Sequence, residues 1–179
     1  MHLLRDLVQN ESVALVGNAA SIFGKLDGEM IDDHSIVIRM NAGYPSLLGR
    51  LQDTGRRTDV WAAAKPFYGP PQDTRLAIFM KLTPLGDSHW PMMQAACKQA
   101  NVPCIRWSHE LEMECQQFVG APPGTGIRML WWLKTYANPV RVSVYGMDCW
   151  KTTTHWSGKR PTANHSPDLE ASAMARLME

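Results

Sequence analysis

The sequence lacks a long hydrophobic run, a run of basic residues and a closely spaced pair of cysteines. No apolar stretch approaches the roughly 20 residues that span a bilayer, and the first eight residues are too short, with Asp6 too early, for a secretory signal. We therefore expect a cytoplasmic protein with no membrane span, and peripheral association with the inner face of the membrane stays open. The net charge of +1 gives no electrostatic footprint for binding long nucleic acid.

Metal-binding and common nucleotide-binding signatures are also missing. His34, His89 and His109 have no metal-like spacing with one another or with an acidic cluster, so we expect no metal and no other cofactor. Neither G-x-G-x-x-G nor the Gly-Lys-Ser/Thr of a P-loop occurs, which disfavours a dinucleotide-dependent oxidoreductase and an ATP-binding protein. Free thiols, mostly packing residues, are expected at all four cysteines: Cys97, Cys104, Cys115 and Cys149.

Short apolar segments alternate with helical ones along a chain of 179 residues, a length that suits one domain over residues 1–179. Strands that are apolar along their whole length indicate a sheet covered on both faces. The alternation predicts an α/β fold, a single Rossmann-like, doubly wound and mostly parallel sheet with flanking helices. The expected strands are Ser12–Val16, Ile36–Met40, Thr58–Ala62, Leu76–Met80, Pro103–Trp107 and Val140–Tyr145.

Capping residues and prolines place four helices between these strands and after them. We expect Ser88–Ala100, with Ser88 as cap and Pro91 in the first turn, then a helix from Ser108 to about Phe118, Ile127–Tyr136, and a last helix opened by Ser166 and Pro167. The polar segment Asp148–Asn164 reads as a mobile loop. The pair Trp131–Trp132 fits either a core or a partner surface.

Two strand ends carry the residues best suited to a nucleotide. After the first strand, Gly17 allows a sharp turn, while Ala19, Ala20 and Ser21 keep the loop small enough for a phosphate to reach its backbone amides. Asn41 ends the second strand, where its carboxamide can donate to a phosphate and accept from a sugar hydroxyl. Ordinary strand-ending turns would use the same residues, so that reading stays open.

A second group of residues could bind an anion and move a proton. Gly124, Thr125 and Gly126 close a stiff loop at a helix N-terminus, which favours phosphate or carboxylate. His165 precedes the last helix, whose positive end disfavours imidazolium and leaves a general base, and Glu170 could orient its ring or satisfy backbone donors. His155, in the polar loop, could donate to a leaving phosphate. The alternatives are that His165 is an ordinary surface histidine and that His155 is a solvated loop histidine.

Taken in order, these segments resemble the four sialylmotifs of the family 29 sialyltransferases. The large motif is similar to Val13–Ser21 with Ile36–Asn41 and Gly55–Thr58, and the small motif to Pro123–Gly146. His155-Trp156 stands where the third motif is expected, and the His165–Glu170 spacing resembles the very small motif.

The resemblance implies an inverting, metal-independent glycosyltransferase with a GT-A-variant fold, a CMP-activated ulosonate donor and a glycan or glycolipid acceptor. His165 would deprotonate the acceptor hydroxyl, His155 would stabilise the departing phosphate, and Glu170 would assist. The implied donor-binding set comprises Gly17, Asn18, Ala19, Asn41, Gly124, Thr125, Gly126 and Gly146.

The chain also departs from the family. Vertebrate members join the large and small motifs by a disulfide, whereas Val13 and about Pro139 stand near those positions here, which fits a reducing cytoplasm. The chain is shorter than those catalytic domains, and the resemblance is weak between Ala62 and Gly120. Two donors, CMP-sialic acid and CMP-Kdo, stay open, with lipopolysaccharide or capsule as the expected destination. The alternative function is a degenerate, non-catalytic CMP-binding or nucleotide-binding module.

Overall fold

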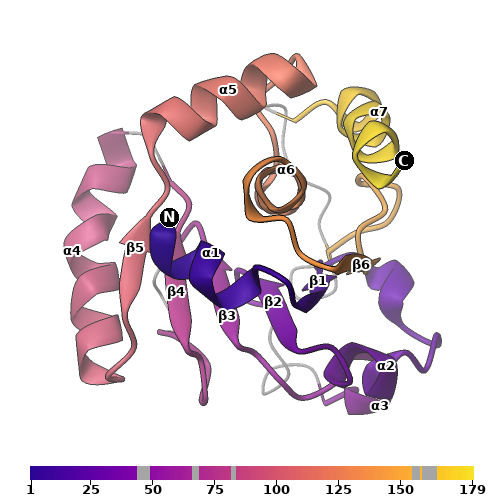
Figure 1. Cartoon of the computed structure of the whole chain (residues 1–179), viewed down its shortest axis with the longest axis horizontal. Coiled ribbons are helices and arrows are strands. Elements are labelled where there is room, and N and C mark those ends of the chain that lie inside the picture. Colours follow the sequence, from indigo (N-terminus) through magenta and orange to yellow (C-terminus); the bar gives the residue numbers. More distant parts are fainter. Residues whose placement is uncertain (44–48, 66–68, 82–83, 155–157, 159–164) are drawn as a thin grey trace.

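The computed structural model describes the chain except for residues 44–48, 66–68, 82–83, 155–157 and 159–164 (Figure 1). Its strands form one sheet in the order β5-β4-β3-β2-β1-β6, and every neighbouring pair is parallel. The sequence predicted a mostly parallel sheet, and the described one is wholly parallel. The strands are β1 (Ser12–Val16), β2 (Ile36–Met40), β3 (Val60–Ala63), β4 (Leu76–Phe79), β5 (Cys104–Arg106) and β6 (Arg141–Tyr145).

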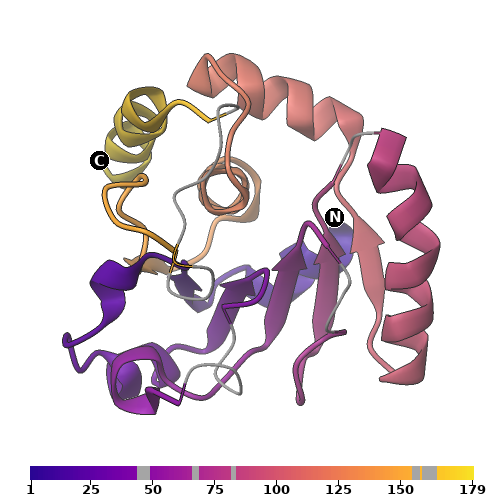
Figure 2. The same cartoon turned by 180° about the vertical axis from the view of Figure 1, so that it is seen from behind.

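Helices cover both faces of the sheet, as a doubly wound fold requires. One face packs against α1 (His2–Val8), α5 (His109–Val119) and α6 (Thr125–Trp132), and α7 (Pro167–Met178) packs on α5 and α6 (Figure 1). The other face packs against η1 (Ala20–Ile22) and α2 (Gly28–Asp32) at one end and α4 (Pro84–Gln99) at the other (Figure 2). The short α3 (Leu51–Thr54) lies beside α2.

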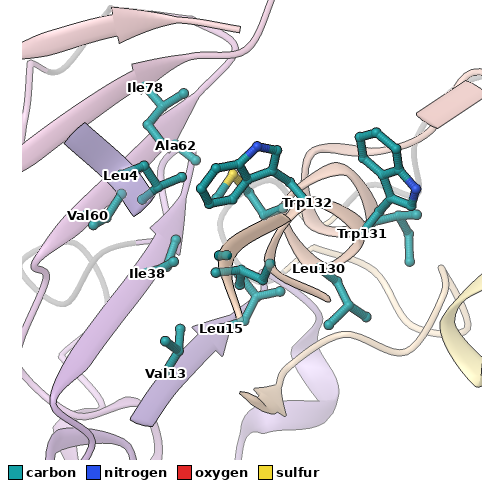
Figure 3. Packing of buried hydrophobic residues seen from close by; sticks show 14 of the residues in the cluster. Leu4, Val13, Leu15, Ile38, Val60, Ala62, Ile78, Leu130, Trp131 and Trp132 are labelled. Atoms are coloured by element: carbon teal, nitrogen blue, oxygen red, sulfur yellow. The ribbon is translucent and has the colours of Figure 1, made fainter. Parts of the chain in front are cut away.

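Alternation along the strands divides the core between the two faces. In β1, Val13 and Leu15 face the α6 side, whereas Ala14 and Val16 face α2. Figure 3 shows the indole of Trp132 pointing from α6 toward the strands. Trp131 and Trp132 are 5% and 2% exposed, so this pair is core and not a partner surface.

The four helices that the sequence predicted differ from the prediction mainly at their ends, whereas α1, α2 and α3 were not predicted. Ser108 caps α5 as expected, with Oγ accepting from Leu111 N–H at 3.2 Å, and Pro167 lies in the first turn of α7. The prediction for α4 was wrong at its start, because the helix begins at Pro84 and not after Ser88. Pro91 therefore lies inside the helix, where it removes one backbone donor. Beyond Trp132, the helix expected to reach Tyr136 continues as a π-helical turn, Leu133–Ala137.

The chain order of the strands creates a switch point between β1 and β6. Strands β1 to β5 are laid down in one direction, and the chain then returns to place β6 on the other side of β1. In open α/β sheets, ligands bind outside the carboxyl ends of the strands at such a point. The ends of β1 and β6 are therefore where a ligand site is expected.

Candidate functional site

The turns after β1 and β6 lie against each other. Gly17 N–H donates to Tyr145 O at 2.7 Å, and Ala19 N–H donates to Gly146 O at 2.9 Å. A Cβ atom on Gly17 would lie 2.3 Å from Gly146 O, and Gly146 itself has φ of +58°. Both positions therefore require glycine, one for close approach and one for its backbone conformation.

Asn18 links the ends of β1 and β2. Its Nδ2 donates to Met40 O at 3.0 Å, which fixes the orientation of the carboxamide. Its Oδ1 is buried next to Gly43, where a Cβ atom would meet it at 1.7 Å, and has no hydrogen-bond partner in the described part of the chain. A buried carbonyl oxygen without a hydrogen-bond donor is uncommon in folded proteins.

Asn41 joins the ends of β2 and β3. It adopts a left-handed conformation with φ of 51°, which asparagine tolerates better than most residues. Its Oδ1 accepts from Ala64 N–H at 2.9 Å, and its backbone oxygen accepts from Trp61 Nε1 at 2.7 Å. The carbonyl of the side chain thus holds the sheet edge, and Nδ2 is the group left to donate elsewhere.

The N-terminus of α6 reaches this edge through Met147, a residue that the sequence analysis did not single out. A Cβ atom on Gly126 would lie 2.8 Å from Met147 Cε, and one on Gly17 would lie 2.4 Å from Met147 Cγ. The same side chain therefore separates the two glycines. Residues more than 100 positions apart in the sequence, Gly17 and Gly126, thus share one neighbour at the switch point.

The carboxylate of Glu170, on α7, lies next to two other candidate residues, Gly124 and His165. Glu170 is 3% exposed; Oε1 accepts from Gly124 N–H at 2.8 Å and Oε2 accepts from Trp150 Nε1 at 2.9 Å. His165 Nδ1 lies 3.2 Å from Oε1. We call Glu170, His165, Trp150 and Gly124 the Glu170 cluster. The sequence predicted an anion at the backbone amides that begin α6. In the structure, the carboxylate of Glu170 already accepts from the first of these amides, Gly124 N–H.

His165 keeps one ring nitrogen beside the carboxylate. Nδ1 is buried and at ion-pair distance from Glu170, but the two groups are not aligned as a hydrogen bond. The imidazole packs against the indole of Trp150, with ring centroids 5.2 Å apart and 31° between planes. The side chain is 27% exposed, so the imidazole is within reach of solvent.

The segment after β6 is tied to the first turn as far as Thr154. Ala20 N–H donates to Thr153 O at 2.9 Å, and Ala19 and Thr154 form an antiparallel bridge. Asp148 Oδ2 accepts from Thr152 N–H at 3.1 Å. This part of the segment expected to be a mobile loop therefore borders the candidate site. His155 lies outside the described residues.

The remaining candidates among the described residues are a metal cluster, a reactive cysteine, another hollow and a membrane-spanning helix. Within the ranges that the structure describes, no three His, Cys, Asp or Glu side chains come together to hold a metal ion. The cysteines are free, and burial raises the pKa of Cys97 and of Cys115 to about 12. A hollow lined by Met1, Trp132 and Tyr136 lies near the C-terminal end of α6, away from the Glu170 cluster. Of the helices described, none is long and apolar enough to cross a bilayer.

The model of glycosyltransferase family 29 (sialyltransferase) matches residues 8–117, more than half of the 179 residues. The chain belongs to this family. The resemblance seen in the motifs is thereby confirmed, and the chain is a glycosyltransferase by family. The match includes Gly17, Asn18 and Asn41 but ends before α6, so it does not extend to Gly124 or His165. No curated protein sequence matches the chain.

Two crystal structures of mammalian sialyltransferases share the fold. One, in complex with Gal-beta-1-3GalNAc-ortho-nitrophenol, has a TM-score of 0.71 and 20% identity over 98% of this chain and 68% of its own. The other has a TM-score of 0.67 and 20% identity over 93% of this chain and 65% of its own. The chain thus spans about two thirds of the length of these relatives, and the likeness confirms the α/β fold.

Proposed function

We propose that this family 29 member transfers an ulosonate, sialic acid or the related Kdo, from a CMP-activated donor to a hydroxyl of a glycan or glycolipid, with inversion at the anomeric carbon. The Glu170 cluster carries the proposal, because it holds His165 beside the start of α6. Two residues further along, Gly126 approaches the Gly17 turn through Met147. The N-terminus of α6 therefore connects the proposed base, His165, to the Gly17 turn proposed to bind the nucleotide.

Unsatisfied groups at the sheet edge suit the donor. Asn18 Oδ1 needs a hydrogen-bond donor, which an amino or hydroxyl group of a cytidine nucleotide can supply. Asn41 Nδ2 would contact the same moiety, whereas Ala19 N–H, expected from the sequence to bind the donor, already donates to Gly146 O. Because Gly124 N–H is already taken by Glu170, we assign the sugar carboxylate to the amides of Thr125 and Gly126, the first of α6.

His165 would act through Nε2, since Nδ1 faces Glu170. Nε2 takes the proton of the acceptor hydroxyl, the oxygen attacks the anomeric carbon from the face opposite the phosphate, and the bond from that carbon to the phosphate oxygen breaks. CMP leaves with both bonding electrons. Glu170 orients the ring and stabilises the imidazolium that forms, as a buried carboxylate does for a catalytic histidine elsewhere.

We further propose that the reaction needs no metal. CMP is a monophosphate leaving group, so backbone amides and a histidine can offset its developing charge where nucleoside diphosphates commonly need a cation. His155 is the proposed donor to that phosphate. Undiminished transfer in excess EDTA is the expected result, and activity restored only by a divalent cation would contradict it.

The test of the base is His165→Ala, with the exposed His109→Ala as matched control. Loss of a general base lowers kcat by roughly 10² or more, while CMP binding measured by calorimetry should persist. The control should transfer at the wild-type rate. Near-normal transfer by His165→Ala, with the donor intact, would remove His165 from the role.

The donor is tested by thermal shift with CMP, CDP, UDP, CMP-sialic acid and CMP-Kdo. A ligand at 100 times its Kd stabilises the folded state by about 2.7 kcal/mol, so a selective response to cytidine monophosphates is expected. CMP binding without transfer or donor hydrolysis in any acceptor screen would instead support a non-catalytic CMP-binding module. That outcome is the second candidate, because the family match ends before the Glu170 cluster.

A further inference from the structure

Trp150 contacts every other member of the Glu170 cluster, yet the transfer proposed above gives it no task. Its Nε1 donates to Glu170 Oε2 at 2.9 Å, and its ring packs on the imidazole of His165. A Cβ atom on Gly124 would lie 3.0 Å from Trp150 Cζ2. One indole therefore touches the base, its carboxylate and the loop that begins α6.

The backbone holds this indole in an unusual way. Cys149 and Trp150 are consecutive left-handed residues, with φ of 51° and 68°, a conformation that bulky side chains rarely adopt. Asp148 closes the turn, with its backbone oxygen accepting from Lys151 N–H at 3.3 Å and Oδ2 from Thr152 N–H. Such conformations persist where surrounding contacts hold them, and they concentrate at functional sites.

The carboxylate of Glu170 depends on this indole for its orientation. A buried carboxylate needs donors on both oxygens, and in the part of the chain that the structure describes, Trp150 Nε1 is the donor to Oε2. With Oε2 held, Oε1 is turned toward Gly124 N–H and His165 Nδ1. Loss of the indole N–H would let the carboxylate rotate and release the imidazole.

We propose that Trp150 is a positioning residue for His165 and acts through the carboxylate of Glu170. The inference rests on the proposed function, in which His165 is the base. It predicts a specific kinetic pattern, because the contacts of Trp150 described above are with His165, Glu170 and Gly124, and none of these three is proposed to hold the nucleotide. Turnover should fall while the KM for the donor is retained.

The test compares Trp150→Phe with Trp107→Phe. Both substitutions remove an indole N–H from a glutamate, since Trp107 Nε1 donates to Glu112 Oε2 at 3.1 Å, and neither of these two residues belongs to the Glu170 cluster. We expect kcat to fall roughly 10- to 100-fold in Trp150→Phe, the equivalent of one lost bond to a charged group. The KM for the CMP-sugar should stay within about twofold, and Trp107→Phe should keep the wild-type kcat. Equal kcat values in the two variants would overturn the proposal.

A second readout separates this inference from the proposed function. The ¹⁵N resonances of the His165 imidazole report which ring nitrogen carries the proton, with or without catalysis. We expect the Nδ1–H tautomer in the wild type and a loss of that preference in Trp150→Phe. An unchanged tautomer would overturn the positioning role even if the protein transfers sugar. A changed tautomer in a protein that transfers nothing would support the role and refute the enzyme.

Trp150→Leu provides a second variant if Trp150→Phe loses cooperative unfolding, because it places less bulk in the left-handed turn. The same loss of kcat and of the tautomer preference is expected. Wild-type turnover in this variant would overturn the proposal as clearly as in the first.

Discussion

Replacing Glu170 with glutamine tests whether the buried carboxylate stabilises the site as its contacts indicate. The substitution keeps the size of the side chain but turns one oxygen into an NH2 group. In one orientation that group meets Gly124 N–H and His165 Nδ1; in the other it meets Trp150 Nε1–H. Either way a buried donor faces a donor.

The orientation that costs less free energy places the NH2 group next to Trp150. It loses the single hydrogen bond from Trp150 Nε1–H and leaves that indole N–H unpaired. A hydrogen bond to a charged group contributes about 1.5–3 kcal/mol, and the removal of a buried charge offsets part of the loss. We therefore expect Glu170→Gln to lower the free energy of unfolding by about 2 kcal/mol. For a chain of this length that corresponds to a Tm lower by roughly 4–8 °C.

Urea denaturation followed by circular dichroism measures this loss, with Glu29→Gln as the matched control. Glu29 is an exposed acid on α2, and exposed substitutions usually change stability by less than about 0.5 kcal/mol. The Glu170 variant should also lose at least tenfold in kcat, because His165 loses its charged partner. If both variants were as stable as the wild type, the carboxylate could not be holding Gly124 N–H and Trp150 Nε1–H together.

Three further predictions concern other parts of the chain. Gly17→Ala places a methyl group 2.3 Å from a neighbouring carbonyl oxygen, so it should cost about 1–3 kcal/mol in urea denaturation and weaken CMP binding; wild-type stability would contradict this. Hydrogen bonds from Leu26 N–H and Gly24 N–H hold the pKa of Asp53 below its usual value, so its contribution is present above the unfolded-state pKa near 4 and is lost as pH falls through the folded pKa. The Tm difference between wild type and Asp53→Asn should therefore shrink from pH 7 to pH 3, and a constant difference would refute the argument. Burial raises the pKa of Cys97 to about 12, so iodoacetamide at pH 8 should label this thiol in urea but not in the native protein, as mass spectrometry can show.

The sheet could be predicted from the sequence because its strands are apolar on both faces. β1 and β2 were placed to the residue, since each ends abruptly in a turn, at Gly17 and at Asn41. The first three helices were missed. They are short, between four and seven residues, and each buries only two residues, so they give no periodic pattern. The start of α4 was misplaced because Pro91 was taken as a first-turn residue when Pro84 had that position.

Three residues of the Glu170 cluster could be singled out from the sequence, but their contacts could not. Capping rules and motif order pointed to Gly124, His165 and Glu170, which are near one another in the structure. Nothing in the sequence indicated that Trp150 would join them. It precedes Glu170 by 20 positions, in a segment whose polar composition indicated a loop, and its placement depends on two left-handed residues that no local rule predicts.

The contacts of α6 also connect the two halves of the proposed site. Gly124 N–H binds the carboxylate that faces the proposed base, while Gly126, two residues later, packs on Met147 beside the Gly17 turn. No flexible connection separates the two, because both glycines belong to the first turn of one helix. A side chain at either glycine would therefore move His165 and the Gly17 turn relative to each other. The distance between the proposed base and the proposed donor turn is thus set by the backbone of a single helix end.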